Sequence, residues 1–158
     1  RIGGDPRTVL TALMNRLSDL GAARSDVPLG VVLSKFDVLQ ELQRVQGSDW
    51  QQIMRNRGAA FLRDPSMGDL AYDDRDGRLL HEEARSLLQR LGADALVAQA
   101  ENAFPTLRYF TVSALGQHSM GDEIHPRGIS PFRTVDPVKW TLARNGVIPT
   151  NAGVPAAP

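Results

Sequence analysis

The sequence predicts an α/β protein with a parallel pair of strands, on three observations. Leu29–Leu33 is an uninterrupted apolar run, and Leu107–Val112 is rich in aromatic and β-branched residues, so both have strand composition. Segments with apolar residues three and four positions apart precede, separate and follow these two runs. Strands that alternate with helices pair in parallel through right-handed crossovers, so we expect a parallel sheet flanked by helices.

Length and composition limit the class of protein. The 158 residues suffice for one domain with a core, and 42% hydrophobic with 23% charged residues is ordinary for a globular protein. Eighteen basic and eighteen acidic residues cancel, which argues against a nucleic-acid-binding arm or a basic membrane patch. The absence of cysteine excludes disulfides, thiolate metal sites and cysteine nucleophiles.

The expected domain covers residues 1–148, and a Pro/Ala-rich tail at 149–158 is expected to be disordered. No apolar run reaches the ~20 residues of a membrane span, and nothing at the N-terminus resembles a signal peptide. We therefore expect a cytoplasmic protein. The chain begins at Arg1 without a methionine, so we expect it to be a piece of something larger.

The first helix should begin at Asp5-Pro6, since aspartate is a good N-cap and proline is tolerated at the first helical position. It should end at Gly21, a residue suited to a left-handed C-cap. One apolar face should lie on the sheet; its residues are Val9, Leu10, Leu13, Met14, Leu17 and Leu20.

Leu29–Leu33 does not alternate between apolar and polar residues, so the sequence predicts a strand buried on both faces. A short helix is expected over 36–45. The weakly patterned segment 49–77 is interpreted as an insertion between the two strands with short helices, in which the acidic stretch Asp69–Asp76 forms an exposed loop.

Apolar spacing then predicts helices over 79–91 and 95–103, followed by the strand at 107–112. A long loop is expected over 117–133, and Asp136-Pro137 repeats the cap of the first helix before a last helix that reaches Val147. Arg133 and the pair Glu82-Glu83 are expected at the surface. Aromatic residues are expected to pack inside: Trp50, Phe61, Tyr109, Phe110 and Trp140.

Each predicted strand ends in a short polar motif, Ser34-Lys35-Phe36-Asp37 after the first and Ser113-Ala114-Leu115-Gly116 after the second. In a parallel pair both motifs emerge at the same edge, which is where open α/β sheets bind ligands. A carboxylate can accept two adjacent N–H donors, as guanine presents them, and a lysine stem can lie along a base. A small residue such as Ala114 lets a backbone N–H approach a base oxygen.

These motifs resemble the [N/T]-K-x-D and S-A-[K/L] motifs of the P-loop GTPases, and Asp5–Val147 is similar to the C-terminal half of bacterial double-GTPase domains. The resemblance implies that Asp37 reads guanine and Lys35 packs on the base. It implies that Ala114, in the Ser113-Ala114-Leu115 motif, contacts the base oxygen through its backbone while Ser113 braces the loop. Ser34 departs from the family's asparagine or threonine.

No G-x-x-x-x-G-K-[ST] motif occurs, so the chain offers no cradle for phosphates or Mg²⁺. Either the phosphate-binding half of the domain lies on a missing part of the polypeptide, or the chain is a degenerate remnant of a GTPase domain. We expect the first, because the edge of the Leu29–Leu33 strand would otherwise expose unpaired backbone groups.

The leading hypothesis is a GTP/GDP-binding portion of a GTPase-like domain, with guanine nucleotide and the missing half or a partner protein as its partners and no nucleic acid. GTP hydrolysis and Mg²⁺ would require the missing half. The alternative is a non-catalytic interaction or scaffold module that no longer binds nucleotide. Asp37→Ala separates the two, since only the first hypothesis needs that carboxylate.

Overall fold

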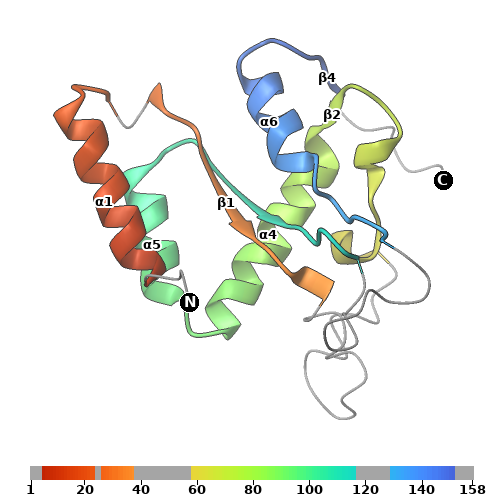
Figure 1. Cartoon of the computed structure of the whole chain (residues 1–158), viewed down its shortest axis with the longest axis horizontal. Helices are drawn as coiled ribbons and strands as arrows, with labels where there is room; N and C mark the ends of the chain where they lie inside the picture. Colours follow the sequence, from red (N-terminus) through yellow and green to blue (C-terminus); the bar gives the residue numbers. More distant parts are fainter. Residues whose placement is uncertain (1–4, 24–25, 38–57, 117–128, 152–158) are drawn as a thin grey trace. The chain divides into compact units, whose positions relative to one another are not determined.

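The computed structural model describes residues 5–23, 26–37, 58–116 and 129–151 (Figure 1). Within them the chain forms short strands, four α-helices and two single 3₁₀ turns, so it is a mixed α/β structure. In chain order the elements are α1 (Pro6–Asp19), β1 (Leu29–Leu33), η3 (Ala60–Leu62), η4 (Pro65–Met67), β2 (Tyr72–Asp73), α4 (Asp74–Arg90), α5 (Asp94–Ala103), β3 (Leu107–Thr111), α6 (Asp136–Arg144) and β4 (Thr150–Asn151).

Helix α1 begins and ends as its sequence predicts. The Asp5 side chain accepts a hydrogen bond from the Arg7 backbone N–H at 3.2 Å, and Pro6 occupies the first turn. At the other end Gly21 has a φ of 66°, and the N–H of Ala22 bonds back to the Leu17 carbonyl at 3.0 Å. This is the left-handed ending that glycine permits.

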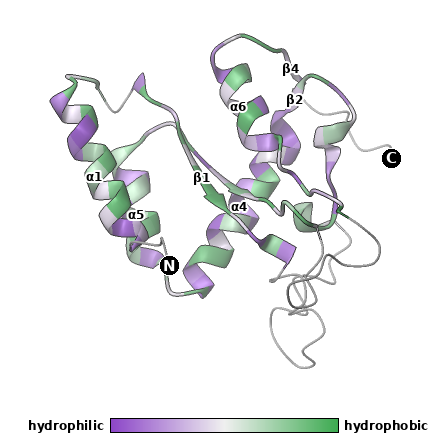
Figure 2. Ribbon diagram, in the orientation of Figure 1, coloured by the Kyte–Doolittle hydropathy of each residue, from purple (hydrophilic) through white to green (hydrophobic). Residues whose placement is uncertain are grey.

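Strands β1 and β3 pair, and the arrows of both point the same way in Figure 1. The Leu29 N–H donates to the Thr106 carbonyl at 2.8 Å, and the Val112 N–H donates to the Leu33 carbonyl at 2.9 Å. The bonded residues advance together along both strands, which confirms the predicted parallel pair. Apolar residues run along β1 in Figure 2, yet Gly30 and Val32 are exposed, so the prediction that both faces are buried is wrong.

The chain divides into two compact units. The first comprises Arg1–Val31 and Arg85–Arg108, and in it α1 packs on α5. Its buried centre is Leu10, Ala100 and Phe104, with half-buried apolar side chains packed around them. An ion pair joins Arg85 to Glu101 at 2.5 Å. The α1 residues that face this core are Leu10, Met14 and Leu17, whereas Val9, Leu13 and Leu20 of the predicted apolar face are exposed.

The second unit comprises Val32–Ala84 and Tyr109–Pro158, and its core is aromatic. Phe36 lies 4.8 Å from Phe61 between ring centroids, and Phe110 meets Trp140 edge-on at 5.7 Å. The expectation that these aromatic side chains pack inside is therefore confirmed for Phe61, Tyr109, Phe110 and Trp140, each at most 3% exposed.

The stretch Asp69–Asp76 is not the exposed loop that its acidity predicts. Ala71 and Tyr72 are buried, and β2 forms a parallel pair with β4 in which Tyr72 is opposite Thr150. Helix α4 then begins at Asp74, five residues earlier than expected. Asp76, in the first turn of this helix, is buried and paired with the arginine described below. Strand β4 lies within the expected tail, two residues beyond the boundary at 148.

Helix α6 also begins differently from the prediction. Asp136 is its first residue rather than its cap, and no side chain caps this helix. Several predictions lie wholly or partly outside the described residues: most of the helix over 36–45, Trp50, most of the loop over 117–133, and the tail from 152. No helix within the described ranges is both long and apolar enough to cross a membrane.

Candidate functional site

The ends of β1 and β3 bring Asp37 and Ser113 together, 76 positions apart in sequence. The Ser113 hydroxyl donates to the Asp37 carboxylate at 2.5 Å and accepts from the Gly116 N–H at 2.9 Å. Both side chains are buried, with 8% of Asp37 and 1% of Ser113 exposed. The two motifs therefore meet at one edge, as predicted. The Asp37 carboxylate, however, is hydrogen-bonded to Ser113 of the same chain.

The other residues of the two motifs do not join this contact. Ser34, Lys35, Ala114 and Leu115 are exposed, and Lys35 has a φ of 59°. A residue other than glycine in this left-handed conformation is uncommon and marks a sharp change of direction. The structure thus places two of the six predicted site residues in a buried contact and four at the surface.

The return segment 129–133 runs against the end of β3. Ser113 and Phe132 form an antiparallel bridge, with hydrogen bonds of 3.0 and 2.8 Å between their backbones. The Ser130 N–H adds a bond to the Leu115 carbonyl at 3.0 Å. Phe132 also stacks on Phe36 with ring centroids 6.1 Å apart. The return segment therefore pairs with the residues that follow β3 and packs on Phe36.

Ser113→Ala tests whether this contact is structural. The variant removes the donor to a buried carboxylate and the acceptor of the Gly116 N–H, so we expect it to lower the free energy of unfolding by about 1–3 kcal/mol. The matched control is Ser34→Ala, at an exposed position, where we expect a change within about 0.5 kcal/mol. Urea unfolding followed by tryptophan fluorescence measures both. Equal effects of the two variants would show that the Asp37–Ser113 bond adds nothing.

The largest buried polar group in the described residues is Arg133, which the sequence led us to place at the surface; that prediction is wrong. None of its surface is exposed, and its φ is 52°. The guanidinium donates to Asp136 at 2.6 Å and to Asp76 at 2.6 Å, and it also bonds the carbonyls of Ala60 and Arg63 at 3.0 and 2.9 Å. Arg133 therefore connects η3, α4 and α6.

One further carboxylate and one further arginine extend the network. Asp64 accepts from the Arg133 backbone N–H at 2.6 Å, and Asp76 also accepts from the half-exposed Arg63 at 2.6 Å. Glu83, expected on the helix surface, instead receives the N–H groups of Ala60 and Phe61 at 2.9 and 3.1 Å and so holds the start of η3. These contacts join residues far apart in sequence, so no local pattern indicates them.

The pKa values of two carboxyl groups around Arg133 are shifted in opposite directions. Burial raises the pKa of Asp136 above its ordinary value, although the Arg133 guanidinium opposes the shift. Burial also acts to raise the pKa of Asp64, but hydrogen bonds from Ser66 and from the Arg133 N–H outweigh it, and the pKa is lowered. Asp136 is thus the carboxyl of this pair that takes up a proton first as the pH falls.

Asp136→Asn should reveal the raised pKa as a pH-dependent difference from the wild type. A group whose folded pKa is raised adds stability that is complete below the unfolded value of 3.8 and is lost as the pH rises through the folded pKa. The wild type should therefore gain stability over the variant as the pH falls from neutral toward 3.8. Urea unfolding of both proteins across this range measures the difference. A constant difference would contradict the shift.

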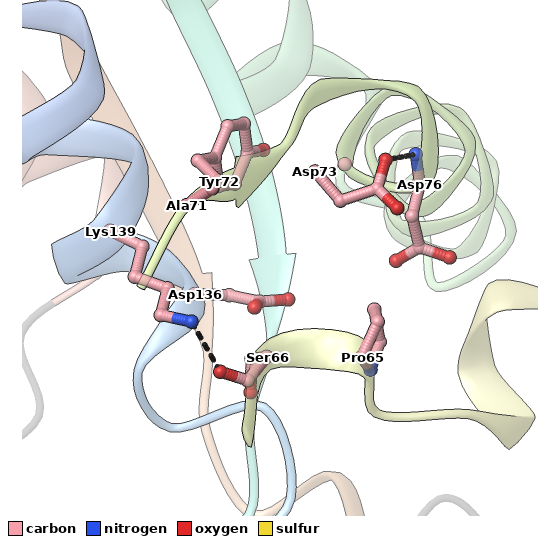
Figure 3. Close-up of a pocket in the computed structure, with 9 residues that line it drawn as sticks. Pro65, Ser66, Ala71, Tyr72, Asp73, Asp76, Asp136 and Lys139 are labelled. Atoms are coloured by element: carbon pink, nitrogen blue, oxygen red, sulfur yellow. Dashed lines mark hydrogen bonds between the residues drawn. The ribbon is translucent and has the colours of Figure 1, made fainter. Parts of the chain in front are cut away.

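A small cavity of about 10 Å³ lies beside this network and holds at most a single water (Figure 3). Asp76, Asp136 and Lys139 line it, together with residues of η4 and β2. The first unit has an open hollow of about 520 Å³, bordered by α1 and Gln99 and lined mainly by polar side chains. Within the described ranges no three His, Cys, Asp or Glu residues gather in a way that could hold a metal ion.

Comparison with known proteins finds a similar sequence in a bacterial protein. The chain is 49% identical over 150 residues to SaeC of Mycolicibacterium smegmatis, whose name proposes a role in ESX-1 scaffolding and assembly. The match covers 92% of this chain and 37% of SaeC, so the chain spans well under half of that protein. No protein-family model matches the chain. No solved structure matches it either.

These findings correct the leading hypothesis. The relative's name describes a scaffolding and assembly protein rather than a GTPase, and no family match supports the P-loop GTPase resemblance or a GTPase-like sheet. The interpretation as a GTP-binding hydrolase is therefore wrong, and so are GTP/GDP and Mg²⁺ as cofactors. The physical reason lies at the strand ends, where Asp37 is buried against Ser113 instead of being open to a base.

Proposed function

We propose that this chain is a non-catalytic protein–protein interaction module of a scaffolding and assembly protein. The observation that carries the proposal is the 49% identity to SaeC over 150 residues, because it extends across nearly the whole chain rather than one motif. A scaffold needs a stable shape and exposed contact residues, and it needs no reacting group. A cytoplasmic location is part of the proposal and can be tested by cell fractionation.

The described residues support this function in two ways. Asp37 is hydrogen-bonded to Ser113, and Asp76 and Asp136 are bonded to the Arg133 guanidinium, so these carboxylates are engaged inside the second unit. Several large apolar side chains are exposed and available for contact with a partner; those above 60% are Leu20, Met67, Leu70 and Val147.

A segment exchange tests the proposed function. The matched segment of SaeC in M. smegmatis is replaced by this chain, and ESX-1 assembly is followed by co-purification of its components with the hybrid. We expect the hybrid to support assembly. The control is the same hybrid carrying Arg133→Met, which should fail because the module loses its buried network. A hybrid that accumulates normally and still supports no assembly would overturn the proposed function.

A further inference from the structure

We propose that the outer edge of β1 pairs with a further β-strand, which the scaffold polypeptide supplies from outside the segment that this chain matches. The outer edge is defined here as the backbone N–H and C=O groups of Gly30 and Val32. The inference rests on the proposed scaffold function, because the strand comes from the rest of that scaffold. It depends on the direction of the β1 hydrogen bonds, the exposure of β1 and the share of SaeC that the chain matches.

The hydrogen bonds between β1 and β3 use alternate residues of β1. The Leu29 N–H donates to the Thr106 carbonyl at 2.8 Å. The Leu33 carbonyl accepts from the Val112 N–H at 2.9 Å. In a parallel pair every second residue of a strand turns its backbone groups toward the neighbour, so the groups of the outer edge point away from β3. Within the described ranges β1 has β3 as its one neighbouring strand, so no strand of these ranges bonds the outer edge.

Strand β1 is the exposed member of the pair. The last three residues of β3 are fully buried, whereas Gly30 and Val32 are exposed, with 45% of Val32 accessible. Yet β1 consists only of apolar residues and one glycine (Figure 2). Parallel strands of this composition normally lie inside a sheet, with a neighbour on each side. The composition of β1 is therefore that of an inner strand, although its position is that of an edge strand.

The outer edge also lacks the features that keep edge strands unpaired. Charged side chains and proline prevent the addition of a strand, and Leu29–Leu33 contains neither. The charge that follows, Lys35, lies beyond the strand where φ reaches 59°. Gly30 is unfavourable in the middle of a strand, but a glycine there leaves room for the close approach of another backbone. These features fit an extended apolar segment that donates and accepts backbone hydrogen bonds.

The share of SaeC outside the match indicates the source of the strand. The chain corresponds to 37% of SaeC, so the larger part of that scaffold lies outside the matched segment. A strand in the same polypeptide is present at a high effective concentration. It also covers the edge permanently, as an apolar edge that is prone to aggregation requires. Pairing with a second copy would leave the edge uncovered whenever the protein is dilute, so we assign the strand to the same polypeptide.

Amide hydrogen exchange, resolved to single residues by NMR, tests the added strand. In the isolated chain the amides of Gly30 and Val32 should exchange readily, while those of Val31 and Leu33, which face β3, are protected. In the hybrid scaffold, isotopically labelled in the matched segment, the Gly30 and Val32 amides should exchange about a hundredfold more slowly. Equal exchange of these two amides in both proteins, whether fast or slow, overturns the added strand.

Photo-crosslinking of the purified hybrid identifies the source of the strand. The amino acid p-benzoylphenylalanine replaces Val32 or, as a matched control, Val138, which is 59% exposed. We expect position 32 to form an adduct within one polypeptide, with an apolar segment outside the matched segment, and position 138 to form no adduct with that segment. Adducts from position 32 only with a second copy or only with residues 1–158, or no adduct at all, overturn the assignment.

A pair of proline variants separates pairing at the outer edge from folding. Val32→Pro removes an N–H of the outer edge, and Val31→Pro removes an N–H that faces β3. Edge strands tolerate proline where the N–H is free, so in the isolated chain Val31→Pro should lower the urea midpoint much further than Val32→Pro. In the hybrid, Val32→Pro should return the Gly30 amide to its exchange rate in the isolated chain. Continued protection of Gly30 in that variant contradicts pairing at this edge.

The added strand and the proposed function fail separately. A hybrid that supports ESX-1 assembly while the Gly30 and Val32 amides exchange as in the isolated chain overturns the added strand alone. A hybrid that protects both amides, forms the expected adduct and still supports no assembly overturns the proposed function alone.

Discussion

Arg133→Met should lower the free energy of unfolding by about 3–5 kcal/mol, the cost expected when one member of a buried charge network is removed. The substitution fills most of the volume but leaves the Asp76 and Asp136 carboxylates without their shared partner. The carbonyls of Ala60 and Arg63 also lose their donors. Urea unfolding at neutral pH measures the loss.

Two variants show whether charge or volume causes this effect. Arg63→Met removes the other cation on Asp76, but the Arg63 side chain is 40% exposed, so we expect a loss of only about 1 kcal/mol. Arg133→Met combined with Asp76→Asn and Asp136→Asn should recover part of the stability, since it removes the uncompensated charges. A triple variant as unstable as the sum of its parts would contradict the electrostatic explanation.

The secondary structure could be predicted from the sequence where neighbouring residues determine it. Asp5-Pro6 and Gly21 predicted both ends of α1, and the apolar run Leu29–Leu33 matches β1 residue for residue. The same reasoning predicted that Asp136 would cap α6, because Asp136-Pro137 repeats the Asp-Pro pair at the start of α1, and this prediction is wrong. There the aspartate bonds a buried arginine instead of its own helix, because a strong partner at 2.6 Å outweighs the cap.

At the candidate site the positions of the residues could be predicted from the sequence, but their accessibility could not. The two polar motifs correctly indicated that Asp37 and Ser113 lie at one edge of the strands, because parallel pairing places both strand ends there. Whether that carboxylate is open to a ligand depends on its hydrogen bond to Ser113, a contact between residues 76 positions apart. The contact of Arg133 with Asp76 was inaccessible for the same reason, since the two residues are 57 positions apart.

Gly116→Ala should be the most damaging small substitution at the strand ends, because two costs add. Gly116 has a φ of 70°, a conformation that costs other residues about 1–2 kcal/mol. An added Cβ would lie 1.5 Å from the Ser130 carbonyl oxygen and 2.6 Å from its carbon. Backbone cannot rotate aside as a side chain can, so overpacking should cost about 1–3 kcal/mol more.

Gly146→Ala separates these two costs. Gly146 lies in the same unit with a φ of 69°, but beyond its chain neighbours no heavy atom of the described residues lies within 4 Å of its added Cβ, so only the conformational cost applies. The Gly116 variant should therefore unfold at clearly lower urea than the Gly146 variant. The shift that relieves the clash must also disturb the bond from the Ser130 N–H to the Leu115 carbonyl. Faster amide exchange at Ser130 and Phe132 in the Gly116 variant alone would locate the damage in the return segment, and equal stability of the two variants would show that this segment does not pack against the end of β3.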